Sequence, residues 1–349
     1  MYANRRSCVC TLAAVPFFGN AGESDLLCGS RHALSLGSGF HLGEVLRRPP
    51  SDFDDLVRLG ARSVRFGIRL SVAKNGEGYE WPFVGIQALD DTLREAARCR
   101  LSVILVLRPP PEPTSILWRS ESFKKSLEII WAKIAERYNG VAVIAAYDLV
   151  NEPHPPGSSF ALKEMTWADL ATRLILRIRE VDSSRLIVYE PSPGARPMAF
   201  RYVKALPFEG IVYSVHLYEP FEYTHQRIGD PRFTSVVDFP GLVPGLGIWD
   251  AKRIAAELEL VRDFGSRSRV HINVGEFGAV RWAPNASREA YLAACTQYFN
   301  AHGWSWHYHA FREWHGWDAE MNADSASRVR NKSEGAMQVL KVGLARCKT

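Results

Sequence analysis

Two glutamates stand at the ends of apolar runs: Glu152 within residues 149–153 (LVNEP) and Glu276 within residues 274–278 (VGEFG). Such a run, ending in one acidic residue, is typical of a buried strand that reaches the rim of a site. Two carboxylates at one rim are the minimum needed to cleave a glycosidic bond. One protonates the leaving group, and the other attacks the anomeric carbon or activates the water that does. An isolated Asn-Glu-Pro also occurs where a helix begins, so the prediction depends on both glutamates together.

Apolar runs typical of buried strands recur along the chain, with amphipathic stretches between them. The predicted strands are 34–41, 63–68, 101–107, 141–150, 186–190, 211–216, 270–275 and 304–309. The predicted helices are 53–59, 89–99, 123–138, 167–181, 251–264 and 288–302. Eight strands alternating with helices favour a single (β/α)₈ TIM barrel in the α/β class, and no glycine-rich dinucleotide motif after the first strand argues for an open sheet.

This order of strands places Glu152 at the end of the fourth strand and Glu276 at the end of the seventh. The carboxyl ends of the strands of such a barrel surround one mouth, so both carboxylates can face a shared substrate. The longest irregular stretch, 219–247, follows the sixth strand and contains four prolines. Because a loop of this length in a compact barrel is usually functional, we expect it beside the same mouth.

The composition is that of a globular protein, with 46% hydrophobic and 23% charged residues among 349. The net charge of +5 comes from scattered basic residues, whereas nucleic-acid binding would need them gathered on one face or arm. Arg5 and Arg6 precede an apolar run at 8–18 and small residues at 19–21, the layout of an export signal. We therefore predict a signal at 1–21, export to the periplasm or medium, and a catalytic domain at 22–349. The alternative is a cytoplasmic protein whose N-terminal segment is not a signal.

Three motifs resemble glycoside hydrolase family 5: residues 147–153 (YDLVNEP), 212–218 (VYSVHLY) and 274–277 (VGEF). The resemblance extends over about residues 37–317, with the motifs in the family's order. It implies a barrel of the clan of retaining glycosidases, in which the catalytic glutamates follow the fourth and seventh strands. It further implies that Glu152 is the acid/base and Glu276 the nucleophile, and that neither a cofactor nor a metal takes part.

The same resemblance assigns supporting roles to four residues. Arg65 would point inward at the nucleophile, where a buried cation keeps Glu276 ionised. Asn151 would bond the sugar 2-hydroxyl, a contact that strengthens as the oxocarbenium-like transition state forms. His216 and Tyr218 are two residues apart on a predicted strand and so share a face. They would contact the acid/base and the nucleophile, respectively. Outside this pattern, Arg65 and His216 would be interpreted as a core ion pair and a core histidine.

The chain departs from the family where the sugar would be held. Arg108, His41 and His309 replace the family's third-strand histidine, its first-strand asparagine and the tryptophan after its eighth-strand tyrosine. Residues 218–226 (YEPFEYTHQ) resemble a substrate-side loop of the family, and tryptophan planes can stack on the apolar faces of sugars. The predicted substrate-binding residues are therefore His41, Arg108, His225, Trp249, Trp282, Trp306, His309 and Trp314.

The resemblance implies an endo-β-1,4-glucanase of the cellulase type, with β-glucan or a related polysaccharide or oligosaccharide as its substrate. We expect a monomer that, once mature, binds neither a membrane nor nucleic acid. A β-mannanase or β-1,3-glucanase would use the same glutamate pair, and a non-catalytic carbohydrate-binding barrel is the alternative from another class. In a further alternative, a metal-dependent hydrolase, His307 and His309 would bind a metal together with His41 or His216. The backbone sugar, the linkage, endo or exo action, disulfide pairing and oligomeric state remain open.

Overall fold

The computed structural model describes residues 36–44, 48–110, 117–118, 120–284, 286–332 and 335–347. These residues belong to one unit, Leu34–Thr349. The predicted export signal at 1–21 lies outside the described residues. Among the helices that are described, none combines the length and the apolar character needed to cross a membrane.

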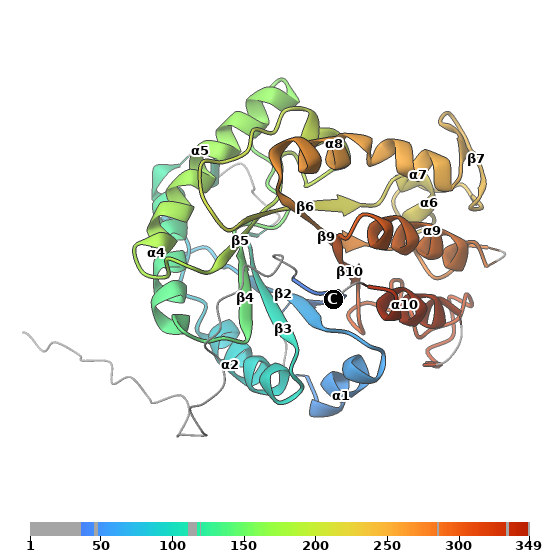
Figure 1. Ribbon diagram of the computed structural model, residues 1–349, viewed down its shortest axis with the longest axis horizontal. Coiled ribbons are helices and arrows are strands. Elements are labelled where there is room, and N and C mark those ends of the chain that lie inside the picture. The colour runs from blue at the N-terminus through green and yellow to red at the C-terminus, as the bar shows by residue number, and fades with distance from the viewer. Residues whose placement is uncertain are drawn as a thin grey trace, which may run out of the picture. The chain divides into compact units, whose positions relative to one another are not determined.

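Eight parallel strands form the centre of the unit. They are β1 (Gly39–Glu44), β2 (Ser63–Arg69), β3 (Ser102–Arg108), β4 (Ile144–Asp148), β5 (Leu186–Tyr189), β6 (Ile211–Leu217), β9 (His271–Phe277) and β10 (Ser305–His309). They pair side by side in the closed order β1-β10-β9-β6-β5-β4-β3-β2. Figure 1 shows the helices arranged around these strands. The predicted (β/α)₈ TIM barrel is thereby confirmed.

The helices cover the outside of the barrel. They are α1 (Pro50–Arg58), α2 (Phe83–Arg98), α4 (Glu121–Tyr138), α5 (Phe160–Arg179), α7 (Ala251–Glu257), α8 (Glu259–Ser268), α9 (Ser287–Ala301) and α10 (Gly335–Ala345), with a 3₁₀ helix, η1 (Pro197–Arg201). The single helix predicted at 251–264 is divided at Leu258 into α7 and α8. The last helix, α10, has no counterpart among the predicted helices and packs against α9 (Figure 1).

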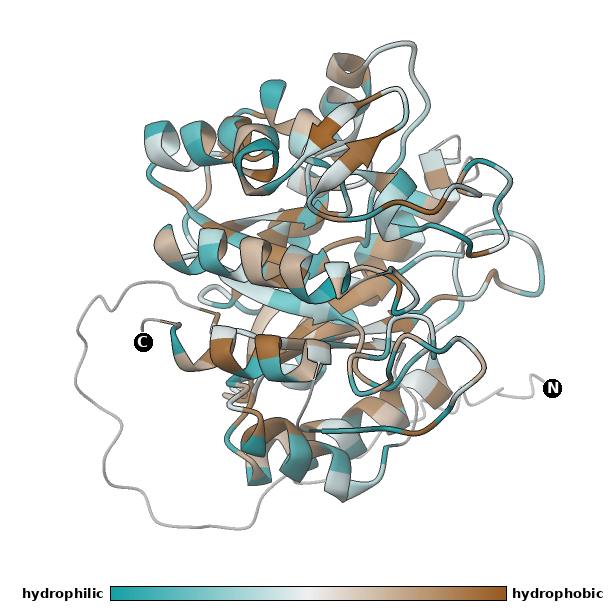
Figure 2. Ribbon diagram, turned by 90° about the vertical axis from the view of Figure 1, so that its right-hand side faces the viewer, coloured by the Kyte–Doolittle hydropathy of each residue, from teal (hydrophilic) through white to brown (hydrophobic). Residues whose placement is uncertain are grey.

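The segment 219–247 contains more regular structure than the sequence predicts. It includes α6 (Phe221–Thr224), and an antiparallel hairpin of β7 (Gly241–Val243) and β8 (Gly247–Trp249) extends just past its end. Leu242 and Ile248 on this hairpin are each 70% exposed, and its strands are brown at the top of Figure 2. The Val280 N–H donates to the Thr224 carbonyl, which ties the segment to the chain that follows β9.

The alternation of side chains along a strand separates the apolar core from a polar interior. On β2, Val64, Phe66 and Ile68 belong to the large hydrophobic core shared with the helices. Arg65, between them, is fully buried and bonds to side chains of other strands across the barrel. A separate small cluster of apolar residues contains Ile104, Ala146, Val188 and Val212, from neighbouring barrel strands. The barrel interior can therefore hold a charged site beside a packed apolar layer.

One buried carboxylate anchors α5 to the end of β5. Glu164 on α5 accepts hydrogen bonds from the Tyr189 hydroxyl and from the Ser192 N–H, the latter at 2.7 Å. Burial raises the pKa of Glu164 to about 7, and these hydrogen bonds oppose the effect only in part. Between pH 5 and pH 7 the folded protein therefore keeps a proton that the unfolded chain releases.

We predict that Glu164→Gln flattens the dependence of stability on pH. The folded-state pKa of about 7 lies above the usual 4.5, so the stabilisation is complete below pH 4.5 and is lost as the pH rises through 7. Glutamine resembles the protonated acid and does not titrate. In urea titrations, the unfolding free energy of the wild type should fall by roughly 2–3 kcal/mol more than that of the variant between pH 5 and pH 8. Parallel pH profiles would contradict a raised pKa.

Candidate active site

The two glutamates singled out in the sequence lie together at the carboxyl end of the barrel. Glu276 is the second-last residue of β9, and Glu152 follows the end of β4 by four residues. A carboxylate oxygen of each lies within 4.8 Å of the other and of a nitrogen of His216. This upper limit fits the roughly 5–5.5 Å between the carboxyl groups of retaining glycosidases and is well short of the roughly 6.5–9.5 Å of inverting ones.

The backbone of Glu152 is held in a strained conformation. Its φ of 46° lies in the left-handed region, which costs a residue other than glycine on the order of 1 kcal/mol. The Glu152 N–H donates to Oε2 of Glu190, the residue after β5, at 2.6 Å. The Glu152 side chain is 36% exposed, whereas that of Glu276 is 5% exposed. The two carboxylates therefore differ in environment as well as in position.

Arg65 is fully buried and binds carboxylates from three other strand ends. Its Nε donates to Asp148 Oδ2 at 2.9 Å, and its Nη1 donates to Glu276 Oε1 at 2.8 Å. Its Nη2 donates to Glu190 Oε1 at 2.6 Å and to Asn151 Oδ1 at 3.1 Å. Burial alone would lower the pKa of Arg65, but the three carboxylates outweigh it and raise that pKa. The guanidinium is therefore charged and, as predicted, points at Glu276.

We predict that Arg65→Met lowers the free energy of unfolding by about 3–5 kcal/mol, because it leaves buried carboxylates without their counter-ion. Arg177→Met is the matched control. Arg177 pairs with Glu180 at the end of α5 with 43% of its side chain exposed, and such exposed pairs contribute at most about 1 kcal/mol. Urea unfolding at pH 7 compares the two variants. Equal losses would contradict the counter-ion role of Arg65.

His216 lies between the two glutamates. Its Nδ1 is 2.8 Å from Glu152 Oε1 and 4.0 Å from Glu276 Oε2, and its Nε2 is 3.2 Å from Glu190 Oε1. Burial alone would lower the pKa of His216, but the charges of Glu190 and Glu276 and the bond to Glu152 raise it to about 10. At neutral pH the ring is therefore an imidazolium that holds a proton directly beside Glu152.

Donors surround the carboxylate of Glu276. Besides Arg65, Arg108 Nη2 donates to its Oε1 at 2.7 Å, and the Tyr218 hydroxyl donates to its Oε2 at 3.0 Å. Burial alone would raise the pKa of Glu276, but neighbouring groups hold it well below its usual range: His309, His216, His41 and Arg108. Glu276 thus has the charge and the fixed orientation that a nucleophile needs.

The three residues that depart from the family pattern lie around Glu276 and its immediate neighbours. Arg108 is the last residue of β3, and besides Glu276 it donates to Asn151 Oδ1 at 3.3 Å. His41 on β1 is fully buried, with its Nε2 3.5 Å from Glu276 Oε1. His309 ends β10 and has its ring 6.3 Å from that of Tyr218. The structure therefore brings all three next to the predicted nucleophile.

Aromatic rings continue the site away from the carboxylates. The ring of His225, just after α6, is 5.2 Å from that of Tyr218. The ring of Trp317 lies 5.8 Å from that of Tyr218 and 5.1 Å from that of His225. Trp314 stands 5.8 Å from Trp317 and is 37% exposed, and the half-buried Trp282 packs 5.7 Å from Trp314. These rings form an aromatic wall that reaches solvent and offers flat apolar faces to a sugar.

A cavity of about 720 Å³ lies against the segment 219–247 and includes His225 in its lining. Trp249 also lines this cavity, but it is 3% exposed and has the Arg253 guanidinium 5.2 Å over its ring. The Trp249 ring therefore cannot offer an open face to a sugar, and its predicted role as a stacking platform is wrong.

The prediction that Trp306 binds substrate is also wrong. Trp306 is 0% exposed, packs 5.6 Å from Phe277 in the hydrophobic core, and donates from Nε1 to Asn300 Oδ1 at 2.9 Å. Neighbouring residues of a strand point to opposite faces, so Trp306 turns toward α9 while His307 and His309 turn the other way.

Several residues of the site were missed in the sequence: Asp148, Glu190, Glu313 and Trp317. Asp148 ends β4 and Glu190 directly follows β5, so a carboxylate at a strand end, the signal used for Glu276, could have found both. Glu313 and Trp317 lie beyond β10, where no periodicity indicates which way a side chain points. Only the contacts of the folded chain reveal them.

Two groups of three side chains in the described part of the chain have the types and spacing of metal ligands. In the first, Glu152, His216 and Glu276, the imidazolium of His216 carries a proton in place of a free lone pair. The second consists of His41, His309 and Glu313. His307 is in neither group, because its Nε2 lies 2.7 Å from Ser63 Oγ inside the barrel. The alternative His307–His309 metal pair therefore does not form.

The chain matches a known family and is similar to known proteins. The model of a family described as Cellulase (glycosyl hydrolase family 5) matches residues 51–313. Endoglucanase C of Acetivibrio thermocellus is 23% identical over 290 residues, which cover 74% of this chain and 82% of the relative. Cellodextrinase A of Ruminococcus flavefaciens is 22% identical over 183 residues, which cover 50% of this chain and 53% of the relative.

The fold resembles solved structures at low sequence identity. The endoglucanase Cel5A of Thermotoga maritima has a TM-score of 0.71 at 21% identity, covering 87% of this chain and 97% of its own. The cellulose synthase subunit Z of Clostridioides difficile has a TM-score of 0.70 at 19% identity, covering 87% and 99%. These likenesses establish the barrel.

Proposed function

The chain belongs to glycosyl hydrolase family 5, and from this membership we propose that it is a retaining endo-β-1,4-glucanase with Glu276 as nucleophile and Glu152 as acid/base. The observation that carries the mechanism is the approach of the two carboxylates to within 4.8 Å. An inverting enzyme needs a wider gap because a water molecule must stand between the sugar and the base. The endoglucanase names of several relatives support β-1,4-glucan as the substrate.

In the first step Glu276 attacks the anomeric carbon while Glu152 protonates the departing oxygen. Arg65, Arg108 and Tyr218 fix the Glu276 carboxylate for this attack. The proton comes from the hydrogen-bonded pair of Glu152 and His216, which shares one across a distance of 2.8 Å. The pair thus supplies an acid beside a leaving group in the cleft.

Asn151 contributes to the same step by its orientation. Its side-chain oxygen accepts from Arg65 and Arg108, so its amide nitrogen is the group left to donate to a sugar hydroxyl. A hydrogen bond to the 2-hydroxyl strengthens as positive charge develops on the ring, and therefore favours the transition state over the bound substrate.

In the second step a water molecule releases the sugar. The covalent bond removes the negative charge of Glu276, and Glu152, having given up its proton, takes one from the water. The water attacks from the side that the leaving group vacated, so the two inversions restore the original configuration. Arg65 and Arg108 stabilise the Glu276 carboxylate as it departs.

Two measurements test this function. Proton NMR of a cello-oligosaccharide digest should show the β-anomer first, and α-anomer as the first product would refute the double displacement. The second measurement is the release of reducing ends from soluble β-1,4-glucan, β-1,3-glucan, mannan and xyloglucan, with Glu152→Gln as the inactive comparison. It identifies which polysaccharide backbone the enzyme cleaves. A rapid fall in the viscosity of soluble β-1,4-glucan is expected for endo action. A preference for mannan or β-1,3-glucan would refute β-1,4-glucan as the substrate but would leave the proposed mechanism unchanged.

We also propose that residues 1–21 direct export and are then removed. Arg5, Arg6 and the apolar run at 8–18 support this proposal. N-terminal sequencing of protein recovered from the periplasm or medium should begin near residue 22, and an intact N-terminus in the cytoplasm would refute it.

A further inference from the structure

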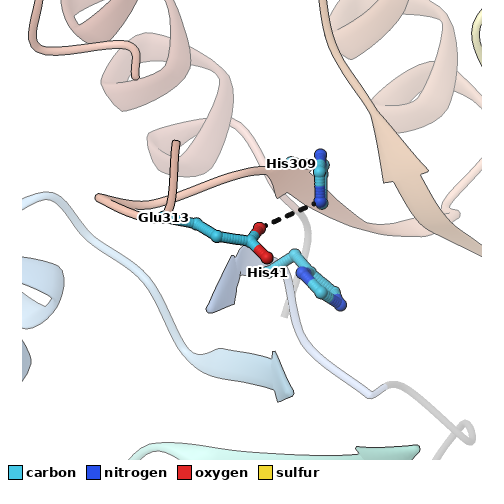
Figure 3. A group of neighbouring side chains, drawn as sticks. All are labelled: His41, His309 and Glu313. Atoms are coloured by element: carbon cyan, nitrogen blue, oxygen red, sulfur yellow. Dashed lines mark ion pairs between the residues drawn. The ribbon is translucent and has the colours of Figure 1, made fainter. Parts of the chain in front are cut away.

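His41, His309 and Glu313 face one another beside the proposed nucleophile, and Figure 3 shows their side chains converging from β1, from the end of β10 and from the chain just after it. His41 and His309 are register partners on neighbouring strands, and their ring centroids are 4.9 Å apart. Glu313 Oε2 lies 3.1 Å from His309 Nε2. One ligand atom from each of the three lies within 4.8 Å of the others.

We propose that these three side chains form a reversible Zn²⁺ site, and that an ion bound there inhibits hydrolysis. Two imidazoles and one carboxylate, with one position open, are a ligand set that zinc favours. Neighbouring ligands of a tetrahedral zinc stand about 3.3 Å apart, given metal–ligand bonds of about 2.0–2.1 Å. His309 Nε2 and Glu313 Oε2 are already at this spacing, at 3.1 Å. A small shift that brings His41 closer to them completes the site.

The surroundings of the cluster make room for coordination. A Cβ built on Gly43 would lie 2.3 Å from the Glu313 carboxylate, so the missing side chain, at a φ of +74°, is what lets Glu313 lie here. The Gly43 N–H donates to His41 Nδ1 at 2.9 Å, which places that nitrogen on the Glu313 side. Zinc would replace this N–H as the partner of Nδ1. Glu313 has 29% of its side chain exposed and His309 13%, so an ion can enter from solvent.

The inhibition follows from His41 Nε2, the ring nitrogen that does not bind the metal and that faces Glu276. With Nδ1 on the metal, the proton of His41 is on Nε2, which lies 3.5 Å from Glu276 Oε1 and 3.2 Å from Arg108 Nη2. Because a guanidinium only donates, Arg108 would have to give up its contact with Nε2. A carboxylate that accepts from a zinc-bound imidazole is a recurrent arrangement around zinc and holds both groups in place. The ion would therefore draw Glu276 toward His41 and weaken its attack on the sugar. This consequence rests on the proposed role of Glu276, whereas zinc binding does not.

Calorimetric titration of the metal-free full chain with ZnCl₂ tests the site. The wild type should bind one equivalent more than His309→Ala. Glu313→Gln should weaken binding of this equivalent by at least about 10–100-fold, the range typical for loss of even an outer-shell partner of a metal ligand. His302→Ala is the matched control, because His302 is an exposed imidazole at the end of α9 that bonds the Tyr298 carbonyl outside the cluster. Equal stoichiometry and affinity in all four proteins would overturn the proposal.

Hydrolysis measured with and without ZnCl₂ tests the consequence. Zinc at ten times its dissociation constant should lower the wild-type rate about 10-fold, EDTA should restore it, and Glu313→Gln should lose this sensitivity. Binding of zinc without any change in rate would overturn the inhibitory role. If instead Glu276→Ala remains fully active, the proposed function fails while the zinc titration still decides the site.

Discussion

Glu276→Ala should lower kcat/KM on β-1,4-glucan by roughly 10⁴-fold or more, because it removes the group that forms the covalent intermediate. The donors that now hold Glu276 would remain: Arg65, Arg108 and Tyr218. The loss should therefore appear in kcat more than in KM. Activity is measured with a reducing-end assay and with an aryl β-cellobioside.

The space left by the Glu276 side chain allows a sharper test. Azide added to Glu276→Ala should restore cleavage of an aryl β-cellobioside with an activated leaving group and yield the α-glycosyl azide, because a single displacement inverts the anomeric carbon. Glu259→Ala on the outer helix α8 is the control for loss of a carboxylate, with an activity close to the wild type. A Glu276→Ala enzyme with an unchanged rate would place the nucleophile elsewhere.

The loss of activity in Glu152→Gln should depend on the leaving group of the substrate. On β-1,4-glucan, whose leaving alkoxide needs a proton, we expect a loss of about 10²–10⁴-fold in kcat/KM, the usual contribution of general acid–base catalysis. On 2,4-dinitrophenyl β-cellobioside the first step needs no acid and should remain fast. The second step still lacks its base, so the glycosyl-enzyme should accumulate.

Stopped-flow absorbance measures this outcome as a burst of dinitrophenolate equal to the enzyme concentration, followed by slow turnover. Wild type on the same substrate is the comparison, and azide should speed the slow phase of the variant and give the β-glycosyl azide. Equal losses on both substrates, without a burst, would contradict the acid/base role of Glu152.

These two residues could be found in the sequence because each ends a strong strand pattern. The apolar runs before Glu152 and Glu276 become β4 and β9, although β4 ends at Asp148, earlier than predicted. Barrel strands are buried on both faces, so their runs are nearly continuous and their order is easy to establish. The order alone then puts the two carboxylates at one mouth.

The aromatic residues could not be sorted in the same way. Trp306 and Trp314 are both tryptophans near β10, yet one is 0% and the other 37% exposed. The face taken by Trp306 depends on the strand's register. The exposure of Trp314 depends on how the chain after β10, which also carries Trp317, packs against Trp282. Neither is encoded in the composition of the segment.

By itself, the sequence determined the barrel and placed Glu152 and Glu276 at one mouth, because periodic burial and strand order can be read from local patterns. The inward direction of Arg65 was implied by the resemblance to the family. Only the tertiary structure decided which groups surround the pair. Closure of the sheet brings β1 against β10, and so places His41 beside His309, 268 residues apart in the chain. The same closure brings Glu190 to Arg65 and His216. Contacts between such distant positions leave no pattern in one sequence, because each residue's local context is compatible with many partners.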